Sequence, residues 1–115
     1  MADNITIDEA NGTWVVRAGG AVIGETTRAL RLRESGHDPV IYFPREDVAM
    51  AFLDASDRST HCPHKGRATY FSIEAEAESL PDVAWSYEMP EPGVERIENH
   101  LAFDESIDSV AVEEL

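Results

Sequence analysis

Alternation of apolar and polar residues with a period of two constrains this chain more than any other feature. It is clearest over residues 13–18 and 21–26, which flank the dipeptide Gly19-Gly20. A period of two places successive side chains on opposite faces of a β-strand, and a two-residue glycine loop supplies the positive φ angles of a tight hairpin turn. The sequence therefore predicts a β-hairpin here and a mainly β fold.

Further strands follow from the same alternation. They are predicted over residues 28–34, 40–43, 68–77, 83–87, 101–103 and 107–112. In the first of them, Arg28 and Glu34 share a face with two leucines and lie about 20 Å apart at 3.3 Å per residue. They are too far apart to pair with each other, so each is expected to have another partner.

One segment breaks the period of two. Pro44 is followed by acidic residues suited to a first helical turn, and apolar residues keep helical spacing from Val48 to Phe52, until residues 54–57 end the pattern. This predicts a short α-helix of two to three turns. With 115 residues, the chain is predicted to be one compact antiparallel domain over residues 1–115, mainly β with one short helix, and residues 113–115 are expected to be a frayed acidic end.

The charge balance limits the partners. The chain has 9 Lys+Arg against 23 Asp+Glu, a net charge of −14. Binding to nucleic acids or anionic membranes draws on clustered basic residues, so neither partner is expected. Lys65 is the single lysine, the other basic residues being arginines. Such a composition is typical of proteins adapted to high salt, where ions screen carboxylates; an ordinary acidic protein is the alternative.

Cysteine content and hydropathy predict the location. Cys62 is the single cysteine and cannot form an internal disulfide, and residues 1–20 lack the pattern of a signal peptide. No apolar stretch approaches the roughly 20 residues that span a bilayer. We therefore expect a cytoplasmic protein. Strand edges would offer a route to a homodimer, which no sequence feature supports.

Several motifs are distinctive in combination. They are Arg28-Ala29-Leu30, Glu34, Tyr42-Phe43-Pro44-Arg45-Glu46-Asp47-Val48, Cys62-Pro63-His64-Lys65-Gly66, Tyr70 and Trp85-Ser86-Tyr87-Glu88. In this order they resemble the family called domain of unknown function 427, over about residues 15–103. The resemblance implies a compact antiparallel domain around a central cavity, similar to the β-tent folds of certain zinc-binding chaperone and nucleotide-exchange proteins.

The resemblance does not carry a reaction or a metal to this chain. A nucleotidyltransferase-like label accompanies the family, but the sequence has no phosphate-cradling glycine loop and no paired-aspartate metal site. The β-tent relatives hold zinc with two Cys-x-x-Cys motifs, whereas this chain has one cysteine. The segment from His61 to His64 offers three ligand types, but only His37 and His100 remain as a second pair. We therefore expect no metal and no cofactor, and interpret the segment as a turn that enters a strand.

The same motifs supply a candidate site for a small polar or anionic ligand. Arginine and lysine would attract negative charge, while aromatic walls would exclude water and stack on a planar group. The predicted ligand-binding residues are Arg28, Glu34, Tyr42, Arg45, Asp47, Cys62, Lys65, Trp85 and Tyr87. The alternative interpretation is architectural, because buried Arg and Glu often satisfy each other and aromatic residues at strand spacing often belong to the core.

Cys62 and Lys65 are also the candidates for a catalytic step, because a nearby cation stabilises a thiolate. A single intracellular cysteine is more often a packed core residue, and a lysine beside a turn is often solvated. The sequence does not decide whether the protein is an enzyme. Three functions compete: small-molecule binding in a central cavity, a protein-interaction or scaffold module with a structural polar interior, and, ranked last, a nucleotidyltransferase-like enzyme.

Overall fold

A computed structural model describes residues 4–115 of the chain. Within these residues it shows ten strands and three single turns of 3₁₀ helix (η). In chain order they are β1 (Ile5–Glu9), β2 (Trp14–Ala18), β3 (Ala21–Thr26), β4 (Leu30–Glu34), β5 (Val40–Tyr42), η1 (Arg45–Asp47), η2 (Met50–Phe52), β6 (Leu53–Cys62), β7 (Gly66–Glu74), β8 (Ser79–Tyr87), η3 (Glu95–Ile97), β9 (Ala102–Phe103) and β10 (Val110–Glu114). The predicted mainly β fold with antiparallel pairing is confirmed.

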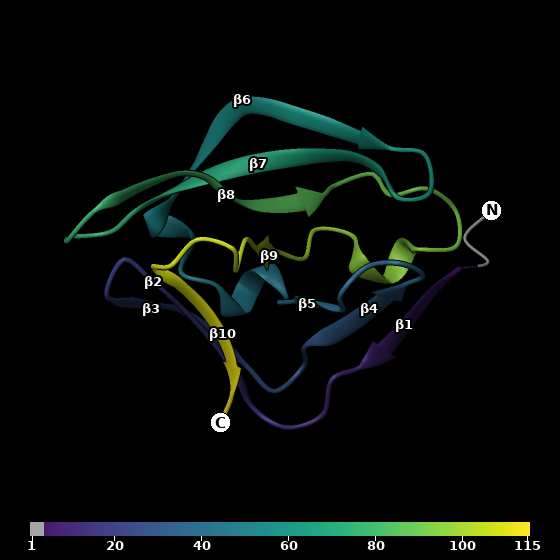
Figure 1. Ribbon diagram of the computed structural model, residues 1–115, viewed down its shortest axis with the longest axis horizontal. Coiled ribbons are helices and arrows are strands. Elements are labelled where there is room, and N and C mark those ends of the chain that lie inside the picture. The colour runs from purple at the N-terminus through teal and green to yellow at the C-terminus, as the bar shows by residue number, and fades with distance from the viewer. Residues whose placement is uncertain (1–3) are drawn as a thin grey trace.

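The strands form sheets in the orders β1-β4-β5, β10-β2-β3 and β6-β7-β8-β9 (Figure 1). A bridge between Phe43 and Leu101 joins the first sheet to the third, and each residue's N–H donates to the other's carbonyl at 2.8 Å. The strands from β1 through β5 and β9 to β6 therefore form one strongly bent layer. In Figure 1 its upper arm holds the long strands β6 to β8 and its lower arm holds β4 and β1.

Two groups of buried apolar side chains stabilise this layer, one on each face. Because side chains alternate along a strand, neighbouring residues belong to different groups: Ile41 and Ala84 to the first, Tyr42 and Trp85 to the second. The hairpin β2–β3 and strand β10 cover the first group. The second group lies on the concave side, where residues of β4 face those of β7 and β8, and this side holds the candidate site.

The predicted hairpin is confirmed at residue level. Ala18 lies opposite Ala21, and Gly19 and Gly20 have φ angles of 59° and 84°, a region that suits glycine. Strands β4, β5, β7, β8, β9 and β10 also lie where alternation predicts strands, with shifted ends. Strand β1 was not predicted, although Ile5 and Ile7 alternate with exposed residues and pack against the second group.

The α-helix predicted after Pro44 is wrong. Two separate 3₁₀ turns, η1 and η2, occupy its place, and Leu53 begins the 10-residue strand β6 where the helix was expected to end. Most side chains of β6 are exposed because the strand is at the edge of its sheet, so no apolar periodicity marked it. No helical segment within residues 4–115 is long and apolar enough to cross a membrane.

The frayed end predicted for residues 113–115 is also wrong. Glu113 and Glu114 belong to β10, which pairs with β2, and the N–H of Leu115 donates to the carbonyl of Thr13 at 2.8 Å. Glu113 forms an ion pair with Arg17 at 2.6 Å. The acidic residues at this end are therefore held in the sheet by backbone hydrogen bonds that do not depend on their polarity.

Candidate functional site

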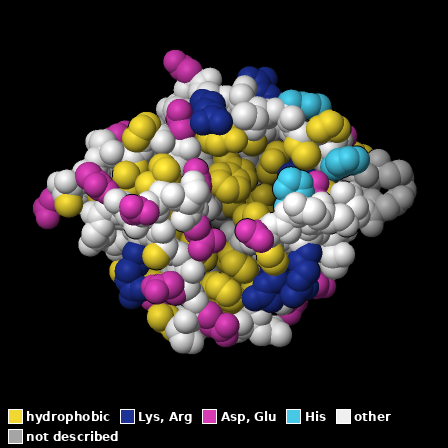
Figure 2. All heavy atoms as spheres, in the orientation of Figure 1, with side chains coloured by type: hydrophobic (Ala, Val, Ile, Leu, Met, Phe, Trp, Pro, Cys, Tyr) yellow, Lys and Arg dark blue, Asp and Glu magenta, His cyan; other side chains and the backbone are white. Residues whose placement is uncertain are grey.

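A pocket of about 340 Å³ opens on the concave side of the bent layer, and we call it the aromatic pocket. Its lining residues are Val40, Tyr42, Arg58, Lys65, Tyr70, Asp82, Trp85, Tyr87 and Asp104. Figure 2 shows a hollow lined by hydrophobic side chains in the middle of this face, with basic, acidic and histidine side chains around it. The volume is in the range that accommodates small ligands.

Alternation along β7 and β8 builds one wall of the aromatic pocket. Tyr70 lies opposite Trp85 in the sheet, and Tyr87 is two residues further along the same strand, so the three rings share one face. The rings of Tyr70 and Trp85 lie with centroids 6.4 Å apart. From β5, the Tyr42 hydroxyl accepts a hydrogen bond from Nε1 of Trp85 at 3.4 Å. Aromatic side chains therefore line the pocket from β5 as well as from β7 and β8.

An ion pair stands at the Tyr87 end of the pocket. Nζ of Lys65 donates to Oε1 of Glu34 at 2.8 Å, and the two side chains are only 15% and 11% exposed. Nζ also lies 5.9 Å from the ring centroid of Tyr87. The hydrogen bond from Lys65 lowers the pKa of Glu34 despite burial, and the charges of His37 and His64 act in the same direction. The pair joins the end of β4 to the turn between β6 and β7.

That turn positions Lys65. Its N–H donates to the carbonyl of Cys62 at 3.2 Å, and its own carbonyl accepts the N–H of Glu91 at 3.0 Å. Gly66 follows with φ of 110°, and a Cβ there would lie 3.2 Å from the carbonyl oxygen of Met89, so glycine suits the position. Cys62 packs beside the second core group. Within residues 4–115, no three His, Cys, Asp or Glu side chains come together as metal ligands.

Burial changes the acidity of the two buried tyrosines of the pocket. It raises the pKa of Tyr42 and of Tyr87 above the ordinary value of 10.0, because the interior disfavours a phenolate. The nearby groups of Glu34 and Cys62 act in the same direction. Both hydroxyls therefore keep their protons at neutral pH and can donate hydrogen bonds.

Three charged side chains of the pocket lack a partner of opposite charge among residues 4–115. The Arg58 guanidinium lies over the ring of Tyr70, 4.6 Å from its centroid, and forms no ion pair with any carboxylate in residues 4–115. The Asp82 carboxylate accepts no hydrogen bond or ion pair from the same residues, although its backbone N–H donates to Ser72. Among the described residues, only Ser106 donates hydrogen bonds to the Asp104 carboxylate.

The lining includes residues that were not among the predicted site residues: Val40, Arg58, Tyr70, Asp82 and Asp104. Tyr70 carried a signal, since it belongs to the family motifs. Arg58 carried none, because it lies in β6, which shows no apolar alternation. Asp82 and Asp104 belong to a strand and a loop whose course toward the pocket depends on pairing rather than on composition.

Arg45 lies outside the pocket and connects three segments. Its Nε donates to the carbonyl of Asn99 at 3.1 Å, and Nη2 donates to Oγ of Ser86 at 3.2 Å and to Oε2 of Glu88 at 3.1 Å. Its guanidinium also lies over the ring of Phe71 on the first core face. These contacts fasten η1 to β8 and to the loop before β9, which is an architectural role.

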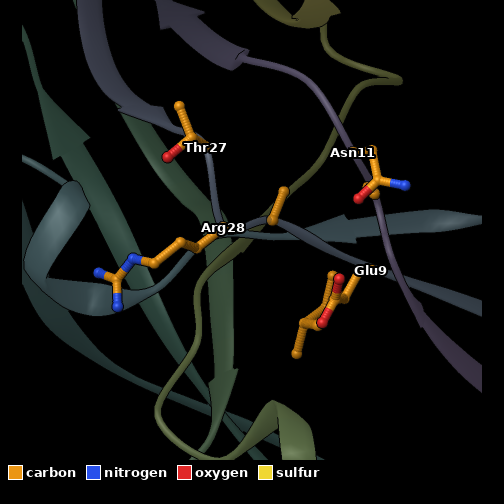
Figure 3. A pocket seen from close by; sticks show the side chains of 7 residues that line it. Glu9, Asn11, Thr27 and Arg28 are labelled. Atoms are coloured by element: carbon orange, nitrogen blue, oxygen red, sulfur yellow. The ribbon is translucent and has the colours of Figure 1, made fainter.

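Arg28 and Asp47 form another separate cluster. Nη2 of Arg28 and the hydroxyl of Thr26 both donate to Oδ2 of Asp47, at 3.2 and 2.7 Å. The partners of Arg28 are therefore Asp47 and, at 3.5 Å, Glu46, and both carboxylates raise the pKa of Arg28. A second pocket of about 290 Å³ lies beside this segment, and Figure 3 shows the Arg28 side chain pointing away from Glu9 and Asn11 there.

The structure thus divides the nine predicted residues. Tyr42, Lys65, Trp85 and Tyr87 line the aromatic pocket. Glu34 forms an ion pair with Lys65, and Cys62 packs against the second core group, but neither lines the pocket. Arg28, Asp47 and Arg45 serve ion pairs elsewhere. The shared site predicted from the motifs therefore contains only part of the set.

A bent antiparallel layer with a charged aromatic pocket on its concave side defines a small β domain with a ligand-sized site. The family model described as Domain of unknown function (DUF427) matches residues 6–113. The chain belongs to this family, as its motifs predicted, and the match extends beyond residues 15–103 at both ends. A search of curated proteins found no match.

Proposed function

We propose that this protein binds a small planar ligand carrying an anionic group in the aromatic pocket. The observation that supports this most strongly is that the Arg58 side chain lies in the pocket without a carboxylate partner among the described residues. In a chain with a net charge of −14, its guanidinium has no carboxylate partner among the described residues and lies on the aromatic wall. A free guanidinium beside aromatic rings suits a carboxylate or phosphate attached to a flat molecule.

Lys65 supports the same proposal. An ammonium group has three donors, and the structure shows one of them directed to Glu34, so others are available to a ligand in the pocket. An ammonium held by a carboxylate is a hydrogen-bond donor rather than a nucleophile, which favours binding over covalent catalysis by Lys65. Cys62 is free, and we propose a cytoplasmic location, where a free thiol persists.

A protein-interaction role is the second candidate, and the edge strand β6 favours it. Within residues 4–115 this strand pairs only with β7, and most of its side chains are exposed. An extended segment of a partner could add to this edge through backbone hydrogen bonds. The aromatic pocket would then be structural. A nucleotidyltransferase activity ranks third, since it is supported by the label that accompanies the family and by no feature of the pocket.

Binding of 4-ethylbenzoate, a flat ring with one carboxylate, tests the proposal. Isothermal titration calorimetry would compare the wild type with Arg58→Gln and with Arg67→Gln, an exposed arginine of the next strand outside the aromatic pocket. Arg58→Gln is expected to weaken binding about tenfold, because a charged hydrogen bond is lost. Arg67→Gln should leave the dissociation constant nearly unchanged.

Three results would count against the proposal. Equal weakening by both substitutions would show a general effect of charge, and absence of binding by the wild-type protein would show that the pocket does not take such ligands. Retained affinity in Arg58→Gln would likewise remove Arg58 from the site. Circular dichroism of each variant would verify that the fold is intact.

A further inference from the structure

The aromatic pocket contains opposite charges that do not neutralise one another. Arg58 and Asp82 both line it, yet neither forms an ion pair within residues 4–115. Asp104 lines the same pocket and has only local hydrogen bonds from Ser106. A pocket that served an anion alone would gain nothing from two carboxylates, because like charge repels the ligand.

The charges are ordered along β8. At one end Lys65 lies over Tyr87, and in the middle Arg58 lies over Tyr70, which is opposite Trp85. Asp82 is three residues from Trp85, about 10 Å at 3.3 Å per residue. Asp104 is at the same end as Asp82, because its N–H donates to the carbonyl of Val83 at 2.8 Å. Lys65 and the two carboxylates therefore lie toward opposite ends of the pocket, and Arg58 lies between them, level with the aromatic rings.

An irregularity in the strand places Asp82 there. Strict alternation from Trp85 and Tyr87 would turn Asp82 toward the first core group and Val83 toward the pocket. The structure shows the reverse: Val83 packs in the first core group and Asp82 lines the pocket. The pairing of β7 with β8 shifts register at this point, and Asp82 has a φ of 55°, which is uncommon for a residue other than glycine. The bulge thus directs a carboxylate into the pocket.

We propose that the ligand is dipolar, with an anionic group for Arg58 and Lys65, a cationic group for Asp82 and Asp104, and a flat ring between them. This inference rests on the proposed function and adds the second charge. A cation at the Asp82 end would be paired, while the ring would stack on the aromatic wall. Small zwitterions with a ring between an amine and a carboxylate belong to this class.

Three matched probes test the inference by calorimetry at low salt. They are 4-(aminomethyl)benzoate, which carries both charges, 4-ethylbenzoate, which lacks the amine, and 4-isopropylbenzylamine, which lacks the carboxylate. The zwitterion is expected to bind about tenfold more tightly than either singly charged probe, because it makes one additional charged hydrogen bond. Low salt preserves these interactions, since ions would screen them.

Substitutions then assign each charge. Asp82→Asn should abolish the preference for the zwitterion without weakening the binding of 4-ethylbenzoate, and asparagine tolerates the positive φ of this position. Asp104→Asn provides a second test in a different backbone conformation. Asp108→Asn, an exposed residue outside the pocket, is the control and should preserve the preference.

The outcomes separate the two proposals. Equal affinity for the zwitterion and for 4-ethylbenzoate would overturn the dipolar ligand while leaving the anion-binding function intact. A preference that survives in both Asp82→Asn and Asp104→Asn would also overturn it. Absence of binding by all three probes would overturn both proposals.

Discussion

Two ion pairs of this protein show how burial determines what a charge contributes. Lys65 and Glu34 lie 2.8 Å apart with side chains 15% and 11% exposed, whereas Arg33 and Asp8 lie 2.9 Å apart with side chains 53% and 52% exposed. The geometry is nearly the same, so the difference lies in solvation. Water can replace the lost partner of the exposed pair but has little access to the enclosed one.

Lys65→Met is therefore expected to be much more harmful than Arg33→Met. The first leaves the Glu34 carboxylate without a partner in apolar surroundings and should lower the free energy of unfolding by about 2 to 3 kcal/mol. The second should cost below about 1 kcal/mol. Urea denaturation of both variants measures the difference, and equal losses would show that the Lys65 pair is effectively solvated.

The same pair predicts a pH dependence. The pKa of Glu34 is lowered below 4.5 in the folded protein, so the folded state holds its proton less tightly than the unfolded state. The ionised Glu34 contributes its full stabilisation to the folded protein above pH 4.5, and this stabilisation is lost as the pH falls through the pKa of Glu34 in the folded state. The difference in unfolding free energy between wild type and Glu34→Gln should shrink as the pH falls below 4.5. A difference that is constant with pH would contradict this assignment.

Tyr42 and Tyr87 give a prediction at the alkaline end. Their pKa values are raised above 10.0, so the unfolded state ionises first and stability should fall as the pH rises above 10. Tyrosinate absorbance of the folded protein should accordingly keep its full amplitude near pH 10 in Tyr42→Phe and in Tyr87→Phe. Loss of amplitude there in either variant would mean that its hydroxyl is reached by water.

At the level of elements, the turn before β7 and the bulge in β8 shape the aromatic pocket. The turn sets Lys65 and the bulge sets Asp82, and each depends on a positive φ, at Gly66 and at Asp82 respectively. Regular strands alone would supply the aromatic wall. The charged groups come from the places where the strands stop being regular.

Gly66→Ala tests the turn. A left-handed backbone costs a residue with a side chain roughly 1 to 3 kcal/mol, and here the new Cβ would also lie 3.2 Å from the Met89 carbonyl oxygen. Gly36→Ala is the matched control, because Gly36 has a φ of 83° with no atom near the added Cβ. Urea denaturation should show the larger loss for Gly66→Ala. Equal losses of unfolding free energy in the two variants would show that the contact with Met89 does not affect stability.

For the molecule as a whole, the acidic excess dominates the electrostatics. A net charge of −14 on a chain of 115 residues produces repulsion that dissolved ions screen. Raising sodium chloride from about 0.05 M to about 1 M should therefore raise the melting temperature, as measured by thermal denaturation. The same salt should weaken binding of 4-ethylbenzoate, because its attraction to Arg58 is screened as well. A melting temperature that falls with salt would show that repulsion between the carboxylates does not limit the stability of this protein.

Much of the fold was predictable, because alternation reports directly which face of a strand is buried. The hairpin around Gly19-Gly20 and the strand that carries Trp85 and Tyr87 follow from it. Strand β6 was missed because most of its side chains are exposed on both faces of the sheet, so its sequence carries no apolar period. The helix predicted after Pro44 failed because the backbone of this segment pairs with β3 instead: Val48 forms a bridge with Gly24, and the N–H of Ala49 donates to the carbonyl of Ile23.

The site was predictable only in part. Local periodicity assigns a side chain to a face, and it correctly gave Glu34 a partner other than Arg28. It does not say which distant strand packs opposite that face. Contacts such as that between Glu34 and Lys65, 31 positions apart, arise when separate strands are brought together by packing. For the same reason, Arg58 and Asp82 line the pocket and Arg28 and Arg45 do not. Long-range strand pairing and the register shift in β8 are stabilised by the assembled sheet, and no local stretch of residues determines them.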